Sequence, residues 1–150
     1  VAPARAGQLD DWVADAEGTQ ALLVLLDQFP RNLFRGSAEA FASDPHARKV
    51  ARVAVLGRRL DLAVPPAARA FFYLPFEHSE AMADQDLSVA LFEGMRDHPP
   101  ARAAGGTIDY AWRHRQVIGR FGRVPHRNAV LGRADTPAEA AYLAQPGAGF

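Results

Sequence analysis

Prolines and helix-capping residues divide the chain into segments of helical length, and no segment alternates between apolar and polar residues for long enough to form a strand. Asp44 followed by Pro45, and the capping box in TPAEAAYL, are typical helix starts, because both supply acceptors for free backbone N–H groups. Pro30 is expected to end the apolar helix before it, since proline has no N–H to donate. We therefore predict an all-α fold in which antiparallel helix pairs form a bundle, as a single domain over residues 1–150. The expected helices lie around residue 12 and over residues 21–26, 44–57, 65–74, 76–95, 107–121 and 136–143.

The composition restricts the partners that the protein can attract. Lysine and arginine together number 17, as do aspartate and glutamate, so no global field draws the chain to nucleic acid or to an anionic membrane. The absence of cysteine excludes disulfides and thiolate chemistry, and no apolar run is long enough to span a bilayer. We expect a cytoplasmic protein with neither a nucleic-acid nor a membrane partner, in which any charge-driven binding is local.

The stretch LPFEHSEAMADQ concentrates carboxylates without an intervening lysine or arginine. On one continuous helix from residue 76 to residue 95, Glu80 falls on the apolar stripe of Leu87 and Leu91. His78 and Gln85 fall on the opposite side of that helix. A carboxylate that faces the core needs a cation or a metal as partner, or a raised pKa. We therefore predict that Glu80 is buried against an arginine.

Residues 109–133 are the obvious source of that arginine, because they contain six arginines and a single aspartate. Two interpretations remain open. In the first, Glu80 and Asp84 form buried salt bridges that fix the packing of two helices. In the second, these carboxylates brace a cavity in which further polar side chains face a ligand. The stretches DQFPRN and GRVPHRN favour the second interpretation, because each places arginine and asparagine after a proline at a helix end.

The second interpretation predicts a pocket for a small anionic molecule or an acidic peptide end, with Arg31 and Arg127 facing the same cavity. The alternatives are a hydrolase-like enzyme with acid–base chemistry, possible metal assistance included, and a structural interaction module. We assign no cofactor, and the oligomeric state stays open. The predicted ligand-binding residues are Arg31, Asn32, Glu77, His78, Glu80, Arg123, His126, Arg127 and Asn128, and the candidate acid–base residues are Glu77, Glu80, His114 and His126.

His114 falls on the apolar face of the helix expected over residues 107–121, which favours a hydrogen-bonded core histidine over a ligand or a base. A metal could draw on Glu77, His78, Glu80 and His114. However, His78 and Glu80 are two residues apart and would lie on different helical faces, unlike the i, i+4 pair of an HExxH motif. We therefore assign no metal site.

Three ordered stretches, LLDQFPRNLFRG, FYLPFEHSE with the DQ that follows, and YAWRHRQVIGRFGRVPHRNAVLGR, closely resemble a bacterial family catalogued as domain of unknown function 924. The resemblance spans about residues 9–150. It implies an all-helical, tetratricopeptide-repeat-like arrangement of helix pairs and no particular reaction. Members usually carry an aromatic-rich segment ahead of the point where this chain begins, so an N-terminal segment is expected to be missing. The polar positions that recur in the family correspond here to Asp27, Gln28, Arg31, Asn32, Glu77, His78, Glu80, His114, Arg123, His126, Arg127 and Asn128.

Overall fold

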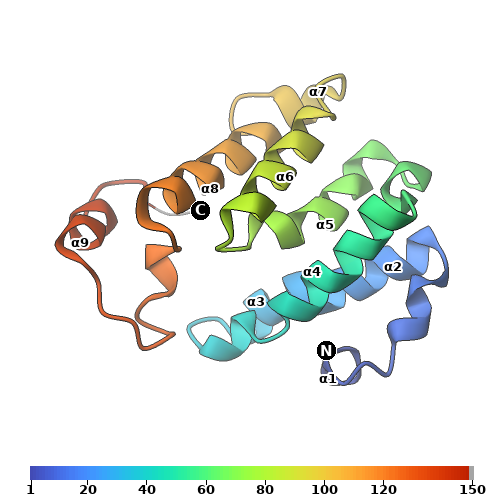
Figure 1. The fold of residues 1–150 in the computed structure, drawn as a ribbon, viewed down its shortest axis with the longest axis horizontal. Helices are drawn as coiled ribbons and strands as arrows, with labels where there is room; N and C mark the ends of the chain where they lie inside the picture. The colour runs from blue at the N-terminus through green and yellow to red at the C-terminus, as the bar shows by residue number, and fades with distance from the viewer. Residues whose placement is uncertain (149–150) are drawn as a thin grey trace.

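The computed structural model describes residues 1–148, and this part of the chain contains helices and turns but no strand (Figure 1). The predicted all-α fold is therefore confirmed. None of the helices described is long and apolar enough to cross a membrane. The α-helices are α1 (Ala2–Arg5), α2 (Ala16–Leu23), α3 (Phe29–Leu33), α4 (Asp44–Arg52), α5 (Pro66–Glu77), α6 (Met82–Glu93), α7 (Pro99–Arg102), α8 (Thr107–Phe121) and α9 (Pro137–Leu143). Short 3₁₀ turns occupy η1 (Asp10–Ala14), η3 (Ala38–Phe41), η5 (Leu60–Ala63) and η6 (Pro125–Arg127), and π turns occupy η2 (Val24–Gln28) and η4 (Val53–Gly57).

Successive helices pack side by side around a common core. The α4 helix packs against α2 and α5, α5 against α6, and α6 against α8 (Figure 1). Short turns reverse the chain between α5 and α6, so these neighbours run antiparallel, as predicted. The largest side chains of the core are fully buried and come from α2, η2, α5 and α6: Leu22, Leu26, Phe72, Phe76 and Phe92.

Pro30 does not end the helix that precedes it, contrary to the prediction. The π turn η2 joins α2 to α3, so helical backbone continues to Leu33. Proline cannot donate to the carbonyl of Leu26 four residues earlier. The hydroxyl of Ser43 donates to that carbonyl instead, over 2.6 Å. Because the buried acceptor keeps a partner, the helix can pass through the proline.

The long helix predicted over residues 76–95 is also wrong, because the chain leaves the helix after Glu77 and starts another at Met82. Gln85 stabilises this break from inside the core. Its side-chain amide nitrogen donates to the carbonyls of Glu77 and Ser79, each over 2.6 Å, at the C-terminal end of α5. Gln85 is fully buried, so the prediction that it faces away from the core was wrong.

The break changes which face of α6 is buried. Leu87 and Leu91, predicted to lie on the core stripe, are only partly buried. The prediction extended the helical periodicity from residue 76 across the turn between α5 and α6, which is not helical. The predicted buried face of α6 was therefore rotated about the helix axis. The buried face of α6 consists of Asp84, Gln85, Ser88, Val89 and Phe92.

Candidate functional site

A cavity of about 580 Å³ lies where α3, η3, α8 and η6 meet the C-terminal end of α5. Most of its lining side chains are basic, acidic or aromatic. The prediction that Arg31 and Arg127 face one cavity is confirmed. The lining residues are Arg31, Phe41, Glu77, His78, Tyr110, His114, Val124, His126, Arg127 and Ala148.

Asp44 brings the two arginines together. Arg31 donates two hydrogen bonds to the Asp44 carboxylate, each over 3.0 Å, and the Arg127 guanidinium lies 3.7 Å from the same group. Both guanidinium groups also lie over the ring of Phe41, 5.7 Å and 4.6 Å from its centroid. The sequence predicted Asp44 to be a helix cap, which is wrong: Ser43 is the capping position, and the Asp44 side chain pairs with arginine. The sequence did not indicate this pairing, because an aspartate followed by proline at a helix start is typical of a capping residue.

Arg127 is a mostly buried cation with few protein partners. Its side chain is 12% exposed, and burial lowers the pKa of its guanidinium. Within residues 1–148 its guanidinium makes no hydrogen bond, and its ion pair is the 3.7 Å contact with Asp44. Both oxygens of that carboxylate already accept hydrogen bonds from Arg31. The N–H groups of Arg127 that border the cavity therefore remain able to bind an acceptor.

Glu77, His78 and His114 form a second group in the cavity wall. One carboxylate oxygen of Glu77 lies 3.3 Å from Nδ1 of His114, and the Glu77 residue is only 3% exposed. Burial and the nearby charge of Asp27 raise the pKa of Glu77 to about 8. Burial also lowers the pKa of His114 to about 3. At neutral pH, Glu77 is therefore mostly protonated and His114 is neutral.

Asp27 is the buried anion behind this group. It lies in the π turn η2, and its carboxylate is 2.8 Å from Nδ1 of His78 and 3.2 Å from Arg31. Burial alone would raise the pKa of Asp27, but His78 and Arg31 outweigh burial and lower this pKa to about 2. Asp27 is one of the recurring polar positions implied by the family resemblance, but it is not among the predicted ligand-binding residues.

Glu80 lies outside the cavity and has a bracing role. Its carboxylate accepts two hydrogen bonds from Arg133, over 2.7 Å and 2.9 Å, and one from the backbone N–H of Val124, over 2.8 Å. The predicted partner, an arginine from the C-terminal third, is confirmed. The predicted burial is wrong, because the side chain is 29% exposed in the turn after α5. The Glu80–Arg133 pair holds the chain just before η6, which carries His126 and Arg127.

The remaining predicted residues also lie away from the cavity. Asn32 is exposed and donates to the backbone of its own helical segment. Arg123 donates two hydrogen bonds to Glu139 of α9, over 2.6 Å and 2.7 Å. Asn128 is buried and donates to Asp135. These side chains fix the C-terminal loop, so the proposed ligand-binding role does not suit them.

Asp84 does not pair with the arginines of residues 109–133, which were the expected partners of the carboxylates. Its carboxylate pairs with Arg52 and Arg48 of α4 and accepts from the hydroxyl of Ser79. The corrected phase of α6 explains the difference, because Asp84 faces α4 rather than α8.

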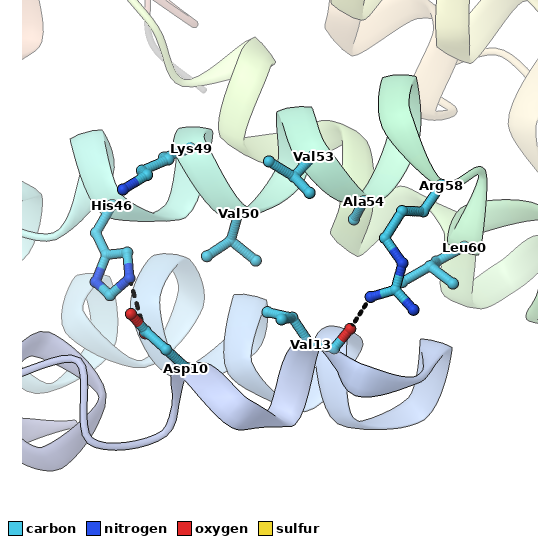
Figure 2. A pocket seen from close by; sticks show the side chains of 9 residues that line it. All are labelled: Asp10, Val13, His46, Lys49, Val50, Val53, Ala54, Arg58 and Leu60. Atoms are coloured by element: carbon cyan, nitrogen blue, oxygen red, sulfur yellow. Dashed lines mark hydrogen bonds and ion pairs between the residues drawn. The ribbon is translucent and has the colours of Figure 1, made fainter.

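A second hollow, of about 160 Å³, lies between η1 and the α4–η4 segment (Figure 2). Its wall is mainly apolar, with Val50 facing the gap. The polar groups at its two ends are already paired: His46 lies 3.1 Å from Asp10, and Arg58 donates to the carbonyl of Val13. This hollow therefore offers little chemistry beyond packing.

The fold and the larger cavity define an all-helical domain with a wall of arginine, histidine and carboxylate side chains. The chain belongs to the family described as a bacterial protein of unknown function (DUF924), whose profile matches residues 1–147. Its structure is similar to that of a protein of unknown function, ATU0120, from Agrobacterium tumefaciens. The two are 43% identical, the TM-score is 0.87, and the similarity covers 96% of this chain and 77% of the other. No curated protein matches the chain.

Proposed function

We propose that the cavity binds a small anionic molecule through Arg127, with Arg31 beside it. The observation that carries the proposal is the state of Arg127: a mostly buried cation at the cavity wall, without a hydrogen bond from its guanidinium to residues 1–148. A guanidinium presents several N–H donors in one plane and binds carboxylate or phosphate oxygens in pairs. An oxyanion in the cavity would accept hydrogen bonds from Arg127, as the Asp44 carboxylate accepts them from Arg31.

The cavity also restricts the kind of anion. Asp27 and Asp44 balance the formal charges of Arg31 and Arg127, so a singly charged group that uses the open N–H donors of Arg127 fits better than a multiply charged one. The volume of about 580 Å³ suits a small molecule. Phe41 adds an apolar face beside the guanidinium groups. A small carboxylate, free or at the end of an acidic peptide, is therefore the ligand class that we favour.

A second candidate function, acid–base catalysis, has one specific observation in its favour. Glu77 and His114 lie 3.3 Å apart in the cavity wall, with the pKa of Glu77 raised to about 8 and the pKa of His114 lowered to about 3. A carboxyl group with a pKa near 8 can release and take up a proton near neutral pH, whereas the low pKa of His114 leaves its imidazole neutral beside Glu77. Turnover of a bound carboxylic ester or amide, lost in Glu77→Gln, would support this function.

A thermal-shift screen of small carboxylates and phosphates, followed by calorimetry, tests anion binding. A ligand at about 100 times its dissociation constant adds about 2.7 kcal/mol to the free energy of unfolding. We expect a carboxylate to stabilise the wild type and Arg102→Met, a matched change at an exposed position of α7, but not Arg127→Met. If no anion stabilises the wild type, or if folded Arg127→Met binds equally well, the arginines are structural and the proposal fails.

A further inference from the structure

We propose that Glu77, His78 and His114 bind one divalent transition-metal ion, with Zn²⁺ the best match, at the wall of the cavity. One ligand atom from each of the three residues can be chosen so that all three atoms lie within 4.8 Å of one another. Imidazole and carboxylate are ligands that Zn²⁺ accepts together. This site goes beyond the proposed anion binding, because it uses a different group of side chains.

The spacing of the three ligands is close to that of a tetrahedral site. Ligand atoms at ordinary zinc distances lie roughly 3.4 Å apart in such a site. With 4.8 Å as the upper bound, the ligand atoms have to close by at most about 1.4 Å, which rotations of their terminal bonds can supply. Three protein ligands leave a fourth position for water or a bound ligand, as in catalytic zinc sites.

Both histidines are held in the manner usual for metal ligands. Nδ1 of His78 lies 2.8 Å from the Asp27 carboxylate, and Nδ1 of His114 lies 2.9 Å from the Tyr110 carbonyl. A carbonyl cannot donate, so Nδ1 of His114 carries the proton, and its lone pair is on Nε2. The carboxylate gives His78 the same arrangement. Hydrogen bonds of this kind orient metal-binding imidazoles and strengthen their basicity.

Glu77 gives evidence for a bound cation that is independent of the spacing of the three ligands. Its residue is 3% exposed, and its second carboxylate oxygen, Oε2, makes no hydrogen bond within residues 1–148. Buried carboxylate oxygens normally have partners, so an orphaned one beside two imidazoles indicates a cation. The charges of Arg31 and Arg127 oppose a further cation, but Asp27 and Asp44 pair with them.

His78 and Glu80 do not share a continuous helix, contrary to the prediction on which a metal site was rejected. The α5 helix ends at Glu77, and Glu80 binds Arg133 instead. His78 occupies the C-capping position of α5, next to Glu77, and the third ligand comes from the middle of α8. The ligands are therefore brought together by packing between helices and not by a local motif.

Metal titration of the chelator-treated full chain tests this site, with Zn²⁺ alone in calorimetry and Co²⁺ alone in visible absorption. We expect the wild type to bind one equivalent, and Co²⁺ to give the intense bands of four-coordinate geometry. Glu77→Gln and His114→Gln should abolish this binding, and Asp27→Asn should weaken it about 10–100-fold. His46→Gln is the matched control, because His46 pairs with Asp10 outside the cavity and should not affect the binding.

Arg127→Met separates the two proposals. The variant should still bind one equivalent of metal but should no longer bind the anion. The two kinds of binding are measured separately, so either proposal can fail while the other stands. The metal proposal is overturned if the wild type binds no stoichiometric metal, or if folded Glu77→Gln binds it with unchanged affinity. If Glu77→Gln and His114→Gln do not fold, the wild-type Co²⁺ spectrum decides. Four-coordinate bands support the site, and the weak spectrum of aqueous Co²⁺ overturns it.

Discussion

Gln85→Met tests whether one buried amide holds the turn that places Glu77 and His78 at the cavity. The Gln85 amide nitrogen donates to two backbone carbonyls at the end of α5, each over 2.6 Å. Methionine has nearly the same length and volume but no N–H, so the substitution removes both hydrogen bonds without leaving a large cavity.

The magnitude follows from the groups that lose their partners. Each buried carbonyl without a donor costs about 1–3 kcal/mol. The amide oxygen of Gln85 makes no hydrogen bond within residues 1–148, so its removal returns about 1 kcal/mol. The net loss in the free energy of unfolding is therefore about 3 kcal/mol. For a chain of this length, that corresponds to a fall in Tm of about 10 °C.

Urea unfolding followed by circular dichroism measures the loss. Gln116→Met, at an exposed position of α8, is the matched control and should change the free energy of unfolding by less than about 0.5 kcal/mol. If the midpoints of the two variants are the same, the carbonyls at the end of α5 do not depend on Gln85. The account of the break between α5 and α6 is then refuted.

Three further measurements test the polar contacts. Glu80→Ala should cost about 1–2 kcal/mol in urea unfolding, less than for a buried pair, because solvent reaches 29% of the Glu80 side chain; a loss above about 4 kcal/mol would contradict this. Tyr73→Phe should cost about 2 kcal/mol, because the Tyr73 hydroxyl donates to the buried Asp61 carboxylate over 2.7 Å, and an unchanged midpoint would show that Asp61 has another partner. Hydrogen bonds from Arg123 lower the pKa of Glu139 to about 2, from 4.5, so its contribution is present above about pH 4.5 and is lost as the pH falls toward 2. The wild type should therefore exceed Glu139→Gln in stability at pH 6 by more than at pH 2.5, and a difference that grows in acid would refute this.

The sequence predicted the helices whose ends are fixed by local chemistry. The capping box of Thr136 and Glu139 starts α9, and the helix over residues 107–121 has the expected bounds. Capping signals act over a few residues, so they can be read without knowledge of the fold. Arg31 and Arg127 were also placed correctly at one cavity, although the premise that Pro30 ends a helix was wrong, because helical backbone continues past Pro30 to Leu33.

The failures come from contacts that join distant parts of the chain. The helix passes through Pro30 because Ser43 satisfies a carbonyl, and α5 ends because Gln85 caps it from the core. No local pattern indicates either contact. Asp44 was misplaced for the same reason, since its pairing with Arg31 depends on how α3 meets α4. Glu77, His78 and His114 come together because α5 packs on α8, and no local pattern in the sequence predicts that packing.

Because of the π turn η2, the cavity wall depends on the number of residues between α2 and α3. Substitutions keep that number constant, so they do not test this dependence. A π turn contains one residue more than an α-helical turn, so η2 is equivalent to a single insertion in an otherwise regular helix. Deleting Val24 and restoring regular helix would rotate Arg31 by about 100° relative to the leucines of α2. Such a deletion removes no side chain from the cavity wall, yet it would turn Arg31 away from Asp44. Gaps in this stretch, more than substitutions, should therefore mark relatives that have lost the site.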